Sequence, residues 1–336
     1  MSVMMWVQFA VSAALILYAG TYLTRYADRL CDALGLGKVW IGVVLLGFVT
    51  SLPEAGSSMV ALLQLHAPDL AVGNMLGSNN FNLLLLVFLD LFYRKGAVTD
   101  LISCGRAQRV PAYFAIFLTS LVGMEIWMGQ QRTLPAVLGI GWGSWAVCLG
   151  YIAGMRAVYQ SNPGVCGSDR QECLAGSRNG LGGIYGGLFI SGVVVVAAAV
   201  WLANTADQIA QVTGWGRTFV GSLFLAMATS LPEMVVTLSA LKLGQMDLAI
   251  GNIFGSNMVN MFLLFVCDVF VRSGALLGMV SGSHLWTVVI GIVMTAVAFA
   301  GLRYKGKVTF FALGWDTWTL FVLYGLGMAV LYQLRS

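Results

Sequence analysis

The chain alternates between long apolar stretches and short polar connections along its whole length. A helix needs about 20 mostly apolar residues to cross a bilayer, and ten stretches have that character. The ten predicted spans cover residues 6–24, 39–64, 70–92, 109–126, 134–155, 181–203, 217–242, 248–271, 284–302 and 315–334. Stretches of this length predict helices rather than the shorter alternating strands of a membrane barrel. We therefore expect an all-α membrane protein with ten transmembrane helices.

Composition supports a membrane protein and excludes other classes. Hydrophobic residues make up 59% of the 336 residues and charged residues 10%, whereas soluble proteins have about 45–50% and 25%. The net charge is +4 and the basic residues are scattered singly, which argues against a nucleic-acid binder. The six cysteines are dispersed, and the spacing of Cys166 and Cys173 indicates neither a disulfide nor a metal site strongly.

The distribution of positive charge predicts the orientation. Loops after odd-numbered spans hold 14 of the 18 Lys and Arg residues, and the opposite side holds 4. Because Lys and Arg favour the cytoplasmic side, both termini should be non-cytoplasmic. No positive charge precedes the first apolar stretch, so we expect a retained helix there. The protein should be integral to the plasma or inner membrane.

The two halves of the chain carry the same motifs. The segment Thr-Ser-Leu-Pro-Glu at 50–54 recurs at 229–233, an offset of 179 residues. Gly-Asn followed by Gly-Ser-Asn, at 73–79, recurs at 251–257 with an offset of 178. Agreement on this scale indicates an internal repeat.

Each repeat contains an odd number of spans, so the second repeat should enter the membrane from the opposite side. We predict a first five-helix repeat at 1–157, a cytoplasmic linker at 158–180, and a second, inverted five-helix repeat at 181–336. In transporters with inverted repeats, the substrate site lies near the membrane midplane, where interrupted helices of the two halves meet.

Each repeat places one glutamate deep in a span, at Glu54 and Glu233. A carboxylate there is costly, and it persists where it faces the protein interior and binds a positive group. Pro53 and Pro232 each remove a backbone donor, which leaves carbonyl oxygens free beside the carboxylates.

Two further polar pairs have the spacing of one helix turn. Ser78 and Asn82, like Ser256 and Asn260, are four residues apart and therefore share a helix face. If these faces meet the glutamates, they complete a set of oxygen ligands. Oxygen ligands without His or thiolate select hard cations such as Ca²⁺ or Na⁺. Two carboxylates balance one divalent ion, although the same pair could hold monovalent cations or protons.

Asp90 and Arg94, like Asp268 and Arg272, are also four residues apart near the ends of spans. We expect these pairs to form structural salt bridges rather than to bind ions.

The duplicated motifs resemble the two alpha repeats of the cation/calcium antiporter superfamily, which includes the sodium/calcium exchangers. The resemblance covers essentially the whole chain. It implies secondary-active export of Ca²⁺ in exchange for Na⁺ or H⁺ by alternating access. It also implies that the protein is not an enzyme and needs no cofactor. The expected partners are the transported ions and the lipid bilayer, with no nucleic acid and no obligatory protein partner.

The resemblance assigns Glu54 and Glu233 as central carboxylates that bridge the Ca²⁺ and Na⁺ sites. It also implies hydroxyl, amide and backbone carbonyl ligands on both repeats. These are Thr50, Ser51, Thr229, Ser230, Ser78, Ser256, Asn82, Asn260, Gly47 and Ala226.

One departure leaves the transported ions open. Many sodium/calcium exchangers carry an aspartate at the position of Asn260, whereas this chain has amides at both Asn82 and Asn260. The missing charge keeps a proton-coupled Ca²⁺ exchanger, or an exchanger of another divalent cation such as Mg²⁺, as alternatives. A passive cation channel would use the same ligands without coupling. The inverted repeat favours the antiporter, because alternating access requires such symmetry and a channel does not.

Overall fold

The protein is helical apart from two short hairpins. The computed structural model describes residues 2–93, 97–98, 106–131, 135–161, 181–213, 227–271, 275–304, 308–310 and 313–334. In one hairpin β1 (Ala136–Val137) pairs antiparallel with β2 (Ile140–Gly141), and in the other β3 (Val308–Phe310) pairs antiparallel with β4 (Leu313–Gly314).

The helices follow the predicted spans. Those of the first half are α1 (Ser2–Leu34), α2 (Lys38–Ile41), the π-helix η1 (Gly42–Leu46), α3 (Gly47–Thr50), α4 (Leu52–Leu63), α5 (Pro68–Tyr93), α7 (Arg106–Gly129) and α8 (Trp142–Ser161). Those of the second half are α10 (Leu181–Val212), α12 (Leu231–Lys242), α13 (Met246–Val271), the 3₁₀ helix η2 (Leu276–Gly278), α14 (His284–Tyr304) and α15 (Trp315–Leu334).

Six described helices, α1, α5, α7, α10, α13 and α14, are long and apolar enough to cross a bilayer. The bent segment from Lys38 to Leu63 makes a seventh if it is counted as one span. Helices also lie in the three other predicted spans, as α8, α12 and α15. Residues 217–226 of the predicted seventh span, and 162–180 of the predicted linker, lie outside the described residues. The all-α membrane fold expected from the sequence is confirmed.

The repeated proline marks the start of a helix in each half. The first bent segment breaks at Ser51, and its two parts meet at 41°. Pro53 lies in the first turn of α4, where the missing N–H leaves no helix hydrogen bond unmade. Ser230 and Pro232 repeat this arrangement at the start of α12. Each half therefore directs the free N–H groups of a helix N-terminus into the protein.

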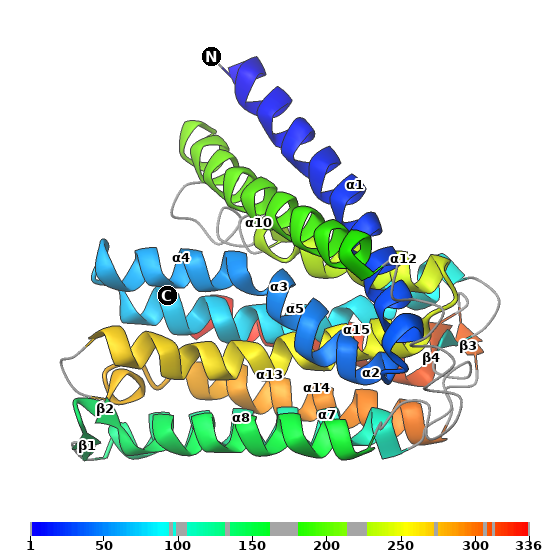
Figure 1. Ribbon diagram of the computed structural model, residues 1–336. Helices are drawn as coiled ribbons and strands as arrows, with labels where there is room; N and C mark the ends of the chain where they lie inside the picture. The colour runs from blue at the N-terminus through cyan, green and yellow to red at the C-terminus, as the bar shows by residue number, and fades with distance from the viewer. Residues whose placement is uncertain are drawn as a thin grey trace.

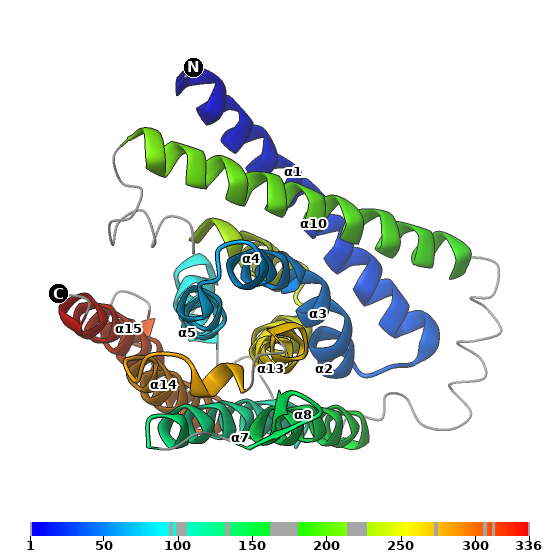
Figure 2. The ribbon, with the colours of Figure 1, turned by 90° about the vertical axis from the view of Figure 1, so that its left-hand side faces the viewer.

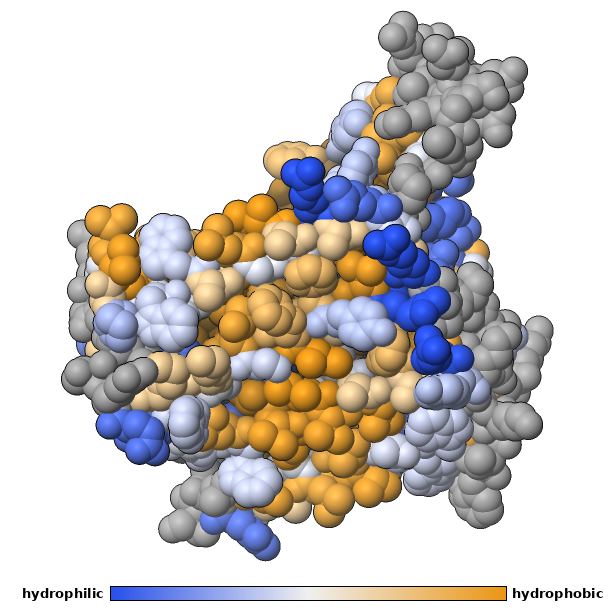
Figure 3. Space-filling model, turned by 90° about the horizontal axis from the view of Figure 1, so that it is seen from below, coloured by the Kyte–Doolittle hydropathy of each residue, from blue (hydrophilic) through white to orange (hydrophobic). Residues whose placement is uncertain are grey.

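The α13 helix lies at the centre of the helix assembly (Figure 2). It packs against η1, α5, α7, α8 and α12, and most of its residues are buried. The α1 and α10 helices pack against each other and extend away from the other helices as a separate pair (Figure 1). Figure 3 shows apolar side chains across the middle of one face, with hydrophilic ones toward its ends. Exposed apolar residues such as Phe117, Leu149 and Ile152 are suited to contact with lipid.

Glycines let α13 approach the backbone of the first bent segment. A Cβ added at Gly255 would lie 2.7 Å from the carbonyl oxygen of Val43, and one at Gly47 would lie 2.7 Å from the backbone nitrogen of Ser256. Gly77 holds the place of Gly255 in the first repeat, and the counterpart of Val43, residue 222, lies outside the described residues. The close backbone contacts at Gly255 and Gly47 therefore join the second repeat to the first along η1 and α3.

We expect Gly255→Ala to lower the thermal stability of the purified protein. The added methyl group overlaps backbone that cannot rotate away, and overpacking of this kind costs about 1–3 kcal/mol. Gly325→Ala, on the exposed side of α15, is the control and should leave the melting temperature unchanged or raise it, because alanine favours helix at an exposed position. Equal melting temperatures for the two variants would contradict the close contact of α13 with η1.

Candidate cation-binding site

Two buried glutamates face each other across the repeats. Glu54 lies in the first turn of α4 and Glu233 in the first turn of α12, and both are fully buried. The hydroxyl of Ser230 donates to Oε1 of Glu54 at 3.3 Å, and the hydroxyl of Ser51 donates to Oε1 of Glu233 at 3.4 Å. Each carboxylate is thus bound by the serine of the opposite repeat. A helix N-terminus further favours negative charge at both positions.

The hydroxyls of the central helices extend this arrangement. The Oγ of Ser78, on α5, lies 3.3 Å from the Oγ of Ser230. The Oγ of Ser256, on α13, lies 3.2 Å from Oγ1 of Thr50. Both contacts again join one repeat to the other.

An amide cluster joins α5 to α13 one turn further along. Asn79 and Asn257 each donate from Nδ2 to the backbone carbonyl of the other, at 3.2 Å in both directions. The Nδ2 of Asn82 donates to Oδ1 of Asn257 at 3.1 Å, and the Nδ2 of Asn260 donates to Oδ1 of Asn79 at 3.0 Å. The donors are used between the helices, so Oδ1 of Asn82 and of Asn260 is left for another partner.

Four buried oxygens in these groups accept no hydrogen bond within the part of the chain that the structure describes. They are Oε2 of Glu54, Oε2 of Glu233, Oδ1 of Asn82 and Oδ1 of Asn260. A buried acceptor without a donor is costly, and two of these oxygens belong to carboxylates. The four atoms form two pairs related by the repeat, and all are oxygens. A hard cation is the partner that such a set selects.

Two further asparagines hold the glutamate backbones in place. The Nδ2 of Asn74 donates to the carbonyl of Glu54 and to the hydroxyls of Ser57 and Ser58. The Nδ2 of Asn252 donates to the carbonyl of Glu233 and to Oγ1 of Thr237. These side chains fix the first turns of α4 and α12, and they do so through the Gly-Asn part of the repeated motif.

The structure places eleven of the twelve predicted ligands among its described residues, and Ala226 lies outside them. The carbonyl oxygen of Gly47 accepts from the N–H of Ser51 at 3.3 Å and from the hydroxyl of Ser256 at 3.5 Å. It lies beside the site, but it already accepts two hydrogen bonds. Thr229 is buried beside Ser230. The roles of Asn79 and Asn257 were not predicted, although both belong to the repeated Gly-Ser-Asn segment.

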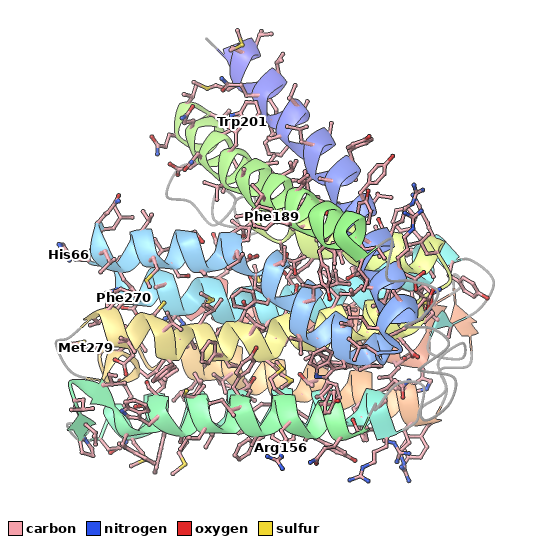
Figure 4. All side chains as sticks on the ribbon, in the orientation of Figure 1. His66, Arg156, Phe189, Trp201, Phe270 and Met279 are labelled. Atoms are coloured by element: carbon pink, nitrogen blue, oxygen red, sulfur yellow. The ribbon has the colours of Figure 1, made fainter. Side chains whose placement is uncertain are left out.

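The histidines do not contribute to the site. His66 lies beyond the end of α4 (Figure 4). The basic side chain of Arg156, on α8, also points outward in this view. The Nε2 of His284 lies 3.1 Å from Oδ1 of Asp69, near the start of α5. The site is therefore built from carboxylate, hydroxyl, amide and backbone oxygens.

A helical membrane protein with a buried oxygen site shared between two repeats belongs among the cation transporters. The model of the family described as "Sodium/calcium exchanger protein" matches residues 4–152 and 183–334, which is most of the chain. The chain belongs to this family, and the resemblance seen in its sequence motifs is confirmed.

Individual relatives agree with this assignment. Inner membrane protein YrbG of Escherichia coli is 26% identical over 270 residues, which cover 79% of each chain. Sodium/calcium exchanger MaX1 of Methanosarcina acetivorans is 26% identical over 267 residues, which cover 72% of this chain and 76% of MaX1. A solved structure of the sodium-calcium exchanger NCX_Mj has a TM-score of 0.72 at 18% identity and covers 98% of this chain and 99% of its own. At that identity the structural likeness shows the shared fold.

We expect Glu54→Gln or Glu233→Gln to abolish Ca²⁺ transport in proteoliposomes, because either change removes a charge that a divalent ion needs. The protein should stay folded, with an unchanged or raised melting temperature, since each change removes one of two buried like charges. Asp207→Asn on the exposed side of α10 is the control and should transport normally. Wild-type rates in both glutamate variants would show that the site is elsewhere.

Proposed function

We propose that this protein is a secondary-active antiporter that exports Ca²⁺ in exchange for Na⁺. The observation that carries the proposal is the four buried oxygens of Glu54, Glu233, Asn82 and Asn260 that accept no hydrogen bond from any described residue. Two ionised carboxylates balance the charge of one Ca²⁺, and the neighbouring hydroxyls and amides add the neutral oxygens that its coordination shell requires. The other predicted ligands, Ala226 among them, complete the proposed set.

The exchange mechanism follows from the symmetry of the site. Glu54 and Glu233 lie at equivalent places in the two repeats, so each can face one side of the membrane when the helices rearrange. An empty site would carry two uncompensated buried charges through the closed state, which is costly. The protein therefore changes sides only with a cation bound, and inward movement of one ion is coupled to outward movement of the other.

The proposal includes the direction and the coupling ion. The distribution of Lys and Arg, 14 against 4, supports non-cytoplasmic termini. Export of Ca²⁺ is the direction that the resemblance of the repeated motifs to the exchangers implies. The name of MaX1 supports Na⁺ as the coupling ion. Protons are the alternative, because the same two carboxylates can bind them, and another divalent cation such as Mg²⁺ can replace Ca²⁺ in an all-oxygen site.

Uptake of ⁴⁵Ca²⁺ into proteoliposomes distinguishes these cases. Vesicles are prepared with an outward Na⁺ gradient, an outward H⁺ gradient or no gradient, and each is repeated with excess Mg²⁺. We expect uptake under the Na⁺ gradient alone. Uptake driven by H⁺ would assign proton coupling, inhibition by Mg²⁺ would show that this ion competes for the site, and equal uptake without any gradient would indicate a channel.

Asn260→Asp should strengthen the dependence of Ca²⁺ transport on Na⁺. The change keeps an oxygen at the Oδ1 position, which accepts no hydrogen bond from a described residue, and replaces the Nδ2 that donates to Asn79 with a second oxygen. The added negative charge favours loading of a further monovalent cation. Asn82→Asp places the same charge on the other repeat and is the matched control for position. The measurement is the initial rate of ⁴⁵Ca²⁺ uptake against internal Na⁺ concentration. A Na⁺ response equal to that of the wild type would refute a role for the missing carboxylate.

A further inference from the structure

Two aspartates outside the cation site join the repeats at opposite ends of the molecule. Asp90, on α5, accepts from the N–H of Val98 at 2.7 Å, from the N–H of Gly314 at 3.0 Å and from the hydroxyl of Thr317 at 2.7 Å. Gly314 and Thr317 belong to the second repeat. Asp90 thus holds the β3–β4 hairpin and the first turn of α15.

Asp268, on α13, has the equivalent position in the second repeat. It accepts from the N–H of Leu276 and from the N–H of Gly141, both at 2.8 Å. The sequence Gly-Trp-Gly-Ser-Trp at 141–145 matches Gly-Trp-Asp-Thr-Trp at 314–318, so Ser144 holds the place of Thr317. The hydroxyl of Ser144 is buried and has no hydrogen-bond partner among the described residues. Within the described ranges, Asp268 therefore has two donors where Asp90 has three.

Glu125, on α7, occupies the space where the described residues supply no third donor. Its side chain is 1% exposed and packs against the Cα positions of Gly141 and Gly143. A Cβ added at Gly141 would meet Glu125 and would also lie 3.2 Å from Oδ2 of Asp268, so the two carboxyl groups share one small region. The N–H of Gly143 lies beside Glu125, but neither carboxyl oxygen accepts a hydrogen bond of normal geometry from a described residue.

The second repeat places a carboxyl group in the matching position from the other helix. Aligning Thr119 with Thr295 sets Glu125 opposite Gly301 on α14, and Gly143 matches Asp316 on α15. Asp316 packs directly against Gly301, as Glu125 packs against Gly143. In both halves a carboxyl group on one helix thus packs against a glycine on the neighbouring helix. The carboxyl group lies on the earlier helix in the first half and on the later helix in the second half. Its presence in both halves indicates that this position requires an acidic group.

The ionisation state of Glu125 determines whether the space between Glu125 and Asp268 holds a proton. Asp268 accepts hydrogen bonds from two backbone N–H groups, whereas an ionised Glu125 would be a buried negative charge that accepts no hydrogen bond of normal geometry from a described residue. The titratable group that faces Glu125 among the described residues is Asp268. The elements packed against α7 present Gly141 and Gly143 beside Glu125, Val288 against Gly123, and Gly278 against Gly129. No group of three His, Cys, Asp or Glu residues suited to a metal occurs in the described ranges.

We propose that Glu125 and Asp268 form a proton-binding site separate from the cation site, in which Glu125 carries the proton and donates it in a hydrogen bond to Asp268. The proton removes one of two adjacent buried charges and supplies the donor that Ser144 does not. It ties α7 and the start of α8 to α13. Loss of the proton at high pH should loosen this junction without removing any ligand of the cation site.

Infrared spectroscopy tests the protonation state directly. The protein has four glutamates, Glu54, Glu125, Glu172 and Glu233. Carbon-13 labelling of glutamate in a Glu54→Gln/Glu233→Gln background leaves two of them to be observed. We expect the carbonyl stretch of a protonated carboxylic acid at neutral pH, shifted by the label and lost on further change of Glu125→Gln. Absence of a labelled protonated band, or its persistence in the triple variant, would overturn the proposal.

The pH dependence of unfolding gives a second readout in otherwise unchanged protein. A proton held in the folded state and released on unfolding makes the unfolding equilibrium constant rise by up to about tenfold per pH unit across the range between the two titrations. The wild type should therefore lose stability as pH rises, and Glu125→Gln should remove this part of the slope while keeping stability and transport. Glu125→Ala should be less stable at every pH, because it leaves Asp268 without a donor and opens a space. Identical slopes for the wild type and Glu125→Gln would show that Glu125 holds no proton.

Discussion

The structure depends on keeping two carboxylates stable away from water. Glu54 and Glu233 are fully buried, so protein groups must replace the solvent that each would have at a surface. In each half a helix that begins beside the repeated serine does this, because its N-terminus brings backbone N–H groups and a serine hydroxyl to the centre of the protein. Each serine donates its hydroxyl hydrogen bond to the glutamate of the opposite repeat, Ser51 to Glu233 and Ser230 to Glu54. Neither half can therefore form the site by itself.

Close backbone contact joins the two repeats beside the site. Gly255 brings α13 against Val43 of η1, and Gly47 brings the first bent segment against Ser256. A side chain at either glycine would overlap backbone of the opposite repeat, so both positions need glycine for the halves to meet at this distance. The counterpart of η1 in the second repeat, at 221–225, lies outside the described residues.

The same physical rule acts outside the cation site. Asp90 and Asp268 are buried because each accepts backbone N–H groups of a hairpin in the other repeat. Among the described residues Asp268 has no third donor, and the proton that we propose on Glu125 would supply one. Buried acidic groups join the two repeats at the centre and near both ends, and Glu54, Glu233, Asp90 and Asp268 each accept from donors of the opposite half.

The spans, the internal repeat, the two buried glutamates and the family could all be predicted from the amino-acid sequence. These follow from local properties, since burial in a bilayer demands long apolar stretches and a duplicated polar motif stands out against them. Sequence spacing predicted that Asp90 and Asp268 would pair four residues along their own helices, but Arg94 and Arg272 lie outside the described residues and the aspartates bind the opposite repeat. Partners of this kind are visible only in the folded protein, and they include the reciprocal hydrogen bonds of Asn79 and Asn257 and the proximity of Glu125 to Asp268. Contacts between residues far apart in the sequence depend on how the two inverted halves pack against each other. The spacing of residues along one segment carries no information about that packing.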